Sequence, residues 1–183
     1  MNASRSLLLL ALLGLAARAA ESFDTWAERI STEWVRQSPQ FATNAQYFSG
    51  VEQDAIDRQL SLIGQWGNAF GRTAAQQRAV LAQRGLQELA AFPREQLTPI
   101  QRSSAALLKW SFEIALADAR YARETWVFDQ FNGLHLDLVN FLTQTHPIRS
   151  PRDAENYLAR LALVPEVLGQ GIAESQRAAQ EGF

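Results

Sequence analysis

The sequence predicts an all-α fold, an irregular bundle of six to seven helices after an N-terminal signal peptide. Apolar residues recur three and four positions apart through most of the chain, which is the periodicity of helices buried on one face. No segment alternates apolar and polar residues as a strand does, and Asn132-Gly133, a dipeptide typical of hairpins, lies between helical patterns. The composition, 47% hydrophobic and 20% charged, is that of a globular protein and excludes disordered or collagen-like chains.

The first nineteen residues have the pattern of a secretory signal peptide. Arg5 precedes an apolar run, residues 7–17, and Ala17-Arg18-Ala19 matches the small-x-small motif that signal peptidase cleaves. Because a membrane-spanning helix needs about 20 apolar residues, we expect cleavage near Ala19 and a periplasmic or secreted product. The alternatives are an uncleaved anchor and a buried helix, whereas a lipoprotein anchor is excluded because the chain has no cysteine.

The first two helices are expected on either side of a turn-rich stretch. Ser22 can cap a helix whose apolar residues recur through Trp34, and Ser38-Pro39 ends that pattern. After Gly50 the next helix is expected at about 51–66, with apolar residues again three or four positions apart. Its apolar stripe and a supporting i,i+4 ion pair are formed by Ile56, Leu60 and Ile63, and by Asp54 with Arg58.

The third and fourth helices are expected to be longer. Thr73 can cap the third helix, which reaches about Ala91 before Pro93 ends it. The dipeptide Thr98-Pro99 supplies a cap and a first-turn proline for the fourth helix, whose pattern continues to about Trp126. Residues expected to face inward are Val80, Leu81, Leu86 and Leu89 in the third helix, and Leu107, Trp110, Ile114, Ala117 and Tyr121 in the fourth.

Breaks at residues 127–133 and at His146-Pro147 bound a short helix, expected at about 134–144. Residues 150–153 combine a serine cap, a proline and an aspartate whose side chain can reach back to the backbone N–H of the cap. They are therefore expected to begin the last helical segment. Pro165 is expected to kink or restart that segment. The apolar residues of these helices are Leu134, Leu138, Phe141 and Leu142, then Tyr157, Leu158, Leu161, Val164, Leu168 and Ile172.

Charge and motif content exclude several classes of function. Loss of the signal removes Arg5 and Arg18 and leaves 15 basic against 19 acidic side chains, a net charge of −4, so a nucleic-acid partner is not expected. The chain has no cysteine, and neither of its two histidines belongs to an H-E-x-x-H or E-x-x-H motif. G-x-S-x-G, P-loop and G-x-G-x-x-G motifs are also absent from the sequence. We therefore assign no catalytic, cofactor-binding or metal-binding residue.

Some residues have the chemistry of a site but favour a structural interpretation. His135 can line a cleft, although a surface or interhelical hydrogen-bonding role fits it better, and His146 is interpreted as a solvated or capping residue. Glu113 and Glu124 lie about 16 Å apart along a helix, too far to share an acid–base site, and are interpreted as solvated charges. Three of the five tryptophans, which otherwise suit sugar stacking, have the spacing of core residues: Trp26, Trp34 and Trp110.

Three segments of the chain carry a further pattern. They are Ser38-Pro39-Gln40-Phe41-Ala42-Thr43 after Trp34, then Gln130-Phe131-Asn132-Gly133-Leu134-His135 before Phe141-Leu142, and Asp153-Ala154-Glu155-Asn156-Tyr157-Leu158-Ala159-Arg160-Leu161 before Pro165. In order and approximate spacing they resemble the S-P-E-x-A-T, N-Q-x-x-G and D-x-x-x-Y-L-x-R-L patterns of the bacterial domain-of-unknown-function family 885. The resemblance extends along the whole mature chain.

The resemblance implies a longer, exported protein that looks like a metal-dependent peptidase or hydrolase. It also implies a His-Glu-x-x-Pro-Gly-His-His site in the C-terminal half, where a divalent metal such as zinc is expected. Residues 1–183 contain no such motif, so no metal-binding or catalytic residue is carried over to this chain. We interpret the chain as the N-terminal helical part of such a protein: a fragment, a truncated gene product or a degenerate paralogue.

Two functions of different classes remain open, and whether the chain is part of an enzyme is left open with them. In the first, residues 20–183 are the non-catalytic scaffold of an exported metallohydrolase and one wall of its substrate cleft, with the missing C-terminal half as partner. In the second, the chain is a complete small periplasmic protein that binds another protein surface without catalysis. For the first function, the break at 128–135 is expected to face the cleft through Gln130, Asn132 and His135.

Overall fold

The computed structural model of the protein describes residues 21–183, and the expected signal peptide, residues 1–19, lies outside the described residues. In the described part the regular elements are helices, accompanied by an isolated antiparallel β-bridge between Ile63 and Ala69. The all-α prediction is therefore confirmed. No helix in residues 21–183 has the length and apolar character needed to cross a membrane.

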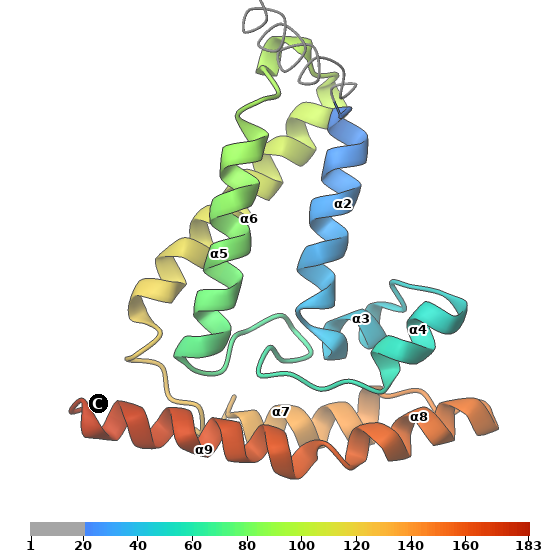
Figure 1. Ribbon diagram of the computed structural model, residues 1–183, viewed down its shortest axis with the longest axis vertical. Coiled ribbons are helices and arrows are strands. Elements are labelled where there is room, and N and C mark those ends of the chain that lie inside the picture. The colour runs from blue at the N-terminus through green and yellow to red at the C-terminus, as the bar shows by residue number, and fades with distance from the viewer. Residues whose placement is uncertain (1–20) are drawn as a thin grey trace, which may run out of the picture.

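The helices form two groups (Figure 1). In chain order they are α2 (Phe23–Arg36), α3 (Pro39–Ala45), α4 (Gly50–Asp57), α5 (Arg72–Leu89), α6 (Pro99–Tyr121), α7 (Leu134–Asn140), α8 (Pro151–Leu161) and α9 (Val164–Gln180). Helices α2, α5 and α6 run steeply in Figure 1 and converge at the top, whereas α7, α8 and α9 lie crosswise along the base. The short helices α3 and α4 connect α2 to α8. A π-helical turn, Phe141–Thr145, directly follows α7.

Each group of helices has its own hydrophobic core. The steep group buries Phe23, Trp26, Ile30, Leu81, Ala82, Leu97 and Phe112. The base buries Leu62, Ile63, Phe70, Ala74, Val127, Leu134, Leu138 and Val167. Helices α5 and α6 approach each other closely because Gly85 lacks a side chain: a Cβ there would lie 2.5 Å from Cε2 of Phe112. A third, smaller cluster of Val35, Ala42 and Ile56 lies between α2, α3 and α4, so the described residues pack around three hydrophobic clusters.

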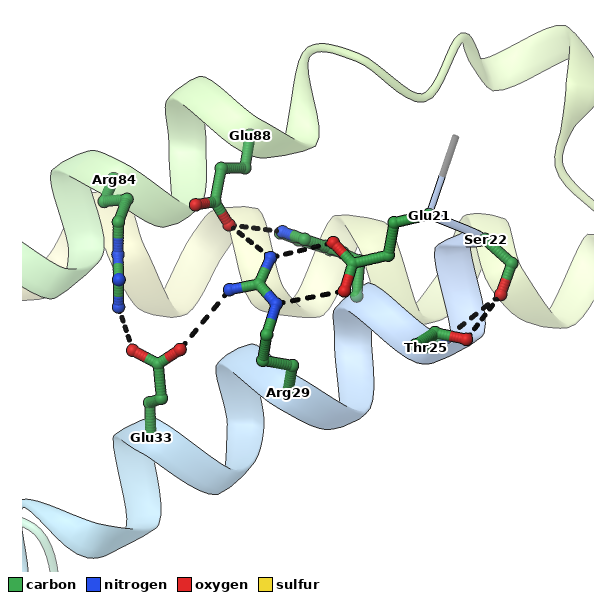
Figure 2. Close-up of polar contacts among 8 residues, drawn as sticks. Glu21, Ser22, Thr25, Arg29, Glu33, Arg84 and Glu88 are labelled. Carbon is green, nitrogen blue, oxygen red and sulfur yellow. Dashed lines mark hydrogen bonds and ion pairs between the residues drawn. The ribbon is translucent and has the colours of Figure 1, made fainter. Parts of the chain in front are cut away.

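Ion pairs tie the outer side of α2 to α5 (Figure 2). Arg29 lies between Glu21, Glu33 and Glu88, and Glu33 also pairs with Arg84. These side chains are about one third to one half exposed, so each pair taken alone adds little to stability.

Several helix boundaries agree with the sequence-based expectations. The Ser22 hydroxyl accepts a hydrogen bond from the backbone N–H of Thr25, and Thr98 and Ser150 each begin a helix with a full capping box. Pro165 restarts the helix, since α8 ends at Leu161 and α9 begins at Val164. These signals act within three or four residues, which explains why the sequence reveals them.

For the second expected helix, the predicted length and the predicted Asp54–Arg58 ion pair are both wrong. Helix α4 ends at Asp57, and residues 60–70 leave it to place Leu62 and Ile63 in the core of the base. Asp54 and Arg58 do not pair with each other, because both turn to α8. Asp54 binds Arg152 at 3.1 Å and Asn156 at 2.8 Å, and Arg58 donates to Asn156 at 2.6 Å. The expected turn-rich stretch before α4 also contains a helix, α3, which Ser38-Pro39 begins.

The start of α5 depends on a distant residue. Thr73 was expected to cap this helix, but its hydroxyl donates to Oε1 of Glu174 at 2.5 Å instead. The other oxygen of Glu174 accepts the N–H of Arg72 at 3.0 Å, so a carboxylate on α9 caps α5. Gly71, at φ 90°, brings the backbone next to Glu174 and is the residue before the helix. Because Glu174 lies 102 residues after Arg72, this cap leaves no local sequence signal.

The prediction of which face of α6 is buried is also wrong. The helix ends at Tyr121 rather than near Trp126, and Trp110 is 60% exposed. Large residues that were expected to face inward but are exposed are Val80 on α5 and Leu107, Trp110, Ile114 and Tyr121 on α6. Helix α6 instead turns Phe112, with its apolar neighbours Leu108 and Ala115, toward α5 and α2. Both faces of this helix are apolar, and the packing of α5 selects the one that is buried.

Candidate functional site

A buried polar junction joins two of the segments that carry the family resemblance. Thr43 of α3, Asp57 at the end of α4 and Arg160 of α8 lie together, and Arg160 is fully buried. The Arg160 guanidinium donates to Oγ1 of Thr43 at 3.0 Å and to the carbonyls of Ile56 at 2.6 Å and Gln59 at 2.7 Å. Thr43 in turn donates to Oδ1 of Asp57 at 2.5 Å. Burial lowers the pKa of Arg160 to about 10, so it stays charged at neutral pH.

His146 packs beside this junction and is buried rather than solvated. Of the two roles expected from the sequence, capping agrees with the structure, because the backbone N–H of His146 donates to the carbonyl of Phe141 at 2.8 Å and caps the π-helical turn. His146 is 8% exposed, and its ring lies between Phe141 and Tyr157. Nδ1 is 3.0 Å from the carbonyl oxygen of Pro147, and Nε2 is 3.5 Å from that of Asp57. Burial and the positive charge of Arg160 lower the pKa of His146. Because these groups bind one another and backbone carbonyls, the junction has a structural role.

A different place in the base has the features of a binding site. A cavity of about 300 Å³ is lined by the loop that follows α4, by α7 and by the segment that leads into α7. Its lining residues are Gln65, Trp66, Asn68, Phe131, Asn132, Leu136, Asp137 and Asn140. Amide side chains, exposed aromatic rings and one carboxylate thus converge on a volume that suits a single small group.

Asp137 is the charged group of this cavity, which we call the Asp137 cavity. It is 8% exposed, and its Oδ2 accepts the backbone N–H of Gln65 at 3.2 Å. A Cβ on Gly64 would lie 2.7 Å from Oδ2, so glycine permits the carboxylate to approach this backbone. Burial raises the pKa of Asp137 above its usual value, and hydrogen bonds from Gln65 oppose the shift. The residues that line the cavity include no arginine, lysine or histidine.

The loop before α7 is held in one conformation by its own residues. Oδ1 of Asp129 accepts the N–H groups of Phe131 and Asn132, both at 2.7 Å. A Cβ on Gly133 would lie 2.5 Å from the backbone nitrogen of Asp129, so only glycine fits there. The resemblance segment 130–135 therefore forms a tight turn that places Asn132 at the cavity.

The structure separates the three residues expected to face a cleft. Asn132 lines the Asp137 cavity, whereas His135 lines an apolar groove of about 330 Å³ and Gln130 is exposed and lines neither. The other residues of that groove are Leu138, Val139, Leu142, Thr143, Tyr157, Leu161, Val164 and Leu168. Asp137 was missed, although one signal pointed to it: an aspartate three residues after Leu134 and four before Phe141 occupies a core position of the helical pattern.

The glutamates that were expected to be solvated and two of the three tryptophans that were expected in the core agree with the structure. Glu113 and Glu124 are exposed, and Glu113 pairs with Lys109 at 3.5 Å. Trp26 is buried, and Trp34 packs on Phe112, with ring centroids 5.5 Å apart. Trp110, which is 60% exposed, is not a core residue.

The described residues do not fit the divalent metal that the resemblance implies for the longer protein. Within residues 21–183, no three histidine, aspartate or glutamate side chains are grouped so that they could hold a metal ion. We therefore derive no metal-dependent step from these residues.

Fold and site together define an all-α domain with a buried polar junction and a small acidic cavity. The family described as "Bacterial protein of unknown function (DUF885)" matches residues 39–183, from the first residue of α3 to the end of α9 and beyond. This match covers most of the chain, and the protein belongs to that family. No curated protein and no solved structure matches the chain.

Proposed function

We propose that residues 20–183 are the non-catalytic N-terminal helical region of an exported bacterial protein that resembles metal-dependent peptidases or hydrolases. In this role they form a scaffold and one wall of a substrate cleft. A divalent metal such as zinc and the catalytic residues belong to the C-terminal half of that protein. The chain reaches the periplasm or the medium after cleavage near Ala19.

Two of the three resemblance segments, 38–43 and 153–161, support a scaffold role because their polar residues are used for packing. The Ser38 hydroxyl donates to the carbonyls of Ile63 and Gly64 at 3.1 and 2.7 Å. Thr43 and Arg160 form the buried junction between α3, α4 and α8. Their side chains bind the protein itself, which is the arrangement expected of residues that maintain a fold.

The observation that carries this proposal is the uncovered apolar face of α6. It is formed by Leu107, Trp110, Ile114, Ala117 and Tyr121, which are all exposed. Monomeric proteins rarely leave a continuous row of large apolar residues in water. The groove lined by His135 adds a second uncovered apolar surface, on α7, α8 and α9. Further protein packed on these surfaces would remove them from water, and the C-terminal half is the partner that the resemblance implies.

Two measurements on the native exported protein test this proposal. An antibody raised against residues 21–183 should detect a periplasmic or secreted band well above the 20.4 kDa of the 183-residue chain. Sequencing of its N-terminus should begin at Ala20. A stable monomeric product at or below 20.4 kDa would favour the alternative, a complete small periplasmic binding protein without enzymatic activity.

Cysteine labelling of the exported protein tests whether the α6 face is covered. The chain has no cysteine, so Leu107→Cys supplies a single reporter on that face. Val80→Cys is the matched control, because Val80 is an exposed apolar residue on the adjacent helix α5. We expect slow labelling at position 107 and rapid labelling at position 80, with equal rates after unfolding. Rapid labelling at both positions in the folded protein would contradict the proposed covering.

A further inference from the structure

We propose that the Asp137 cavity binds a cationic group of a peptide, the ammonium of a lysine side chain or the guanidinium of an arginine. Such binding specifies the ligand of one part of the proposed cleft wall and in that sense rests on the proposed function. The binding itself needs only residues that this chain contains.

The charge of the cavity is the first reason. Asp137 is buried, and its hydrogen bonds come from Gln65, a neutral residue. Buried carboxylates are normally paired with a cation. Glu174, which is buried to a similar extent, follows that rule and binds Arg177 at 2.8 Å. No cationic residue lines the Asp137 cavity, so a ligand cation would supply the partner that the fold omits.

The remaining lining residues suit an ammonium or guanidinium group. The amides of Asn68, Asn132 and Asn140 each carry a carbonyl oxygen that can accept a hydrogen bond from a cationic donor. Trp66 and Phe131 also line the cavity and are 71% and 77% exposed. Exposed aromatic rings beside a carboxylate attract cations and cover the alkyl part of a lysine or arginine side chain.

The cavity is also preorganised. Thr145 donates to Oε1 of Gln65 at 2.9 Å, which holds the residue that binds Asp137. In the segment before α7, Asp129 and Gly133 hold the turn that carries Asn132. Ligand binding would therefore cost little conformational entropy of the protein, which favours measurable binding of a single side chain.

Binding of a lysine probe to the full exported protein tests this site. The probe is Nα-acetyl-lysine-N-methylamide, the arginine analogue is a second arm, and the neutral control is Nα-acetyl-norleucine-N-methylamide. In an NMR titration we expect the cationic probes to shift the amide signals of residues 64–68 and 131–140. The norleucine control should bind at least about tenfold more weakly, since it lacks the charge. Equal binding of lysine and norleucine probes, or no binding of either cationic probe, would overturn the proposal.

Variants locate the binding at Asp137. Asp137→Asn keeps the shape and the acceptor for the Gln65 N–H but removes the charge, so we expect lysine binding to weaken at least about tenfold with an unchanged fold. Trp66→Leu, at an exposed position, should weaken it by about two- to fivefold. Glu95→Gln, an exposed charge removal in the turn between α5 and α6, is the matched control and should leave binding unchanged. Unchanged affinity in Asp137→Asn would refute the site.

Failure of this inference and failure of the proposed function give different results. An exported product no larger than 20.4 kDa that still binds lysine would refute the longer protein and keep the site. Loss of the cationic preference in a larger protein with a protected position 107 would refute the site and keep the scaffold role.

Discussion

Replacing Arg160 by methionine tests whether the resemblance segments serve the fold. Methionine keeps most of the length and the apolar stem of arginine but has no donor. The change leaves the carbonyls of Ile56 and Gln59 without their partner and removes the cation beside Asp57. Loss of one member of a buried charged network costs about 3–5 kcal/mol. For a domain of this size we expect the melting temperature to fall by about 6–20 °C.

Thermal and urea unfolding followed by far-UV circular dichroism provide the assay. The matched control is Arg152→Met on the same helix, because Arg152 is half exposed and binds Asp54 at 3.1 Å. A surface pair of this kind contributes about 0–1 kcal/mol, so the control should stay close to wild type. The structural role of Arg160 would be refuted if its variant lost less than about 1 kcal/mol, or no more than the Arg152 variant.

Three further predictions concern helix packing, pH and the α6 face. Gly85→Ala should destabilise the protein by about 1–3 kcal/mol, because the new Cβ meets the ring of Phe112. The control Gly169→Ala should stabilise it by about 0.5–1 kcal/mol, since no atom lies within 4 Å of the new Cβ. Equal effects of the two variants in urea unfolding would contradict the close packing at Gly85. Burial raises the pKa of Asp137 in the folded protein above its value in the unfolded chain. The protonated carboxyl therefore contributes to folding stability at pH values below the unfolded pKa, and this stabilisation is lost as the pH rises through the folded pKa. Melting curves between about pH 3 and pH 7 should therefore show wild type losing stability relative to Asp137→Asn, and parallel pH profiles would argue against an unpaired carboxylate. Trp110→Lys in the 183-residue chain should change stability by less than about 0.5 kcal/mol, because the indole is largely exposed, and a large loss would restore the core assignment of Trp110.

One residue of the candidate site, Asn132, was among those singled out from the sequence, whereas the substrate cleft itself stays a prediction. The break before α7 was expected to face a cleft, and Asn132 from that break lines the Asp137 cavity. The loop is local, since Asp129 and Gly133 shape it within five residues, and this is why a sequence pattern can mark it. Asp137 and Gln65 are 72 residues apart, and their hydrogen bond arises only when the loop after α4 packs against α7.

The sequence by itself determined the helical class and the positions where most helices begin. Caps such as Thr98 with Gln101 and Ser150 with Asp153 satisfy backbone groups over three residues, so they need no tertiary contact. The restart at Pro165 has the same local origin, because proline cannot donate a backbone hydrogen bond within a helix.

Only the tertiary structure decided which partners and which faces these helices use. Glu174 caps α5 from α9, and Asp54 and Arg58 bind α8 rather than each other. Helix α6 has apolar residues on both sides, and contact with α5 through Gly85 selects the side of Phe112 for burial. Periodicity shows that a helix has an apolar face, but the free energy of burial depends on what packs against that face, and the neighbour comes from a distant part of the chain.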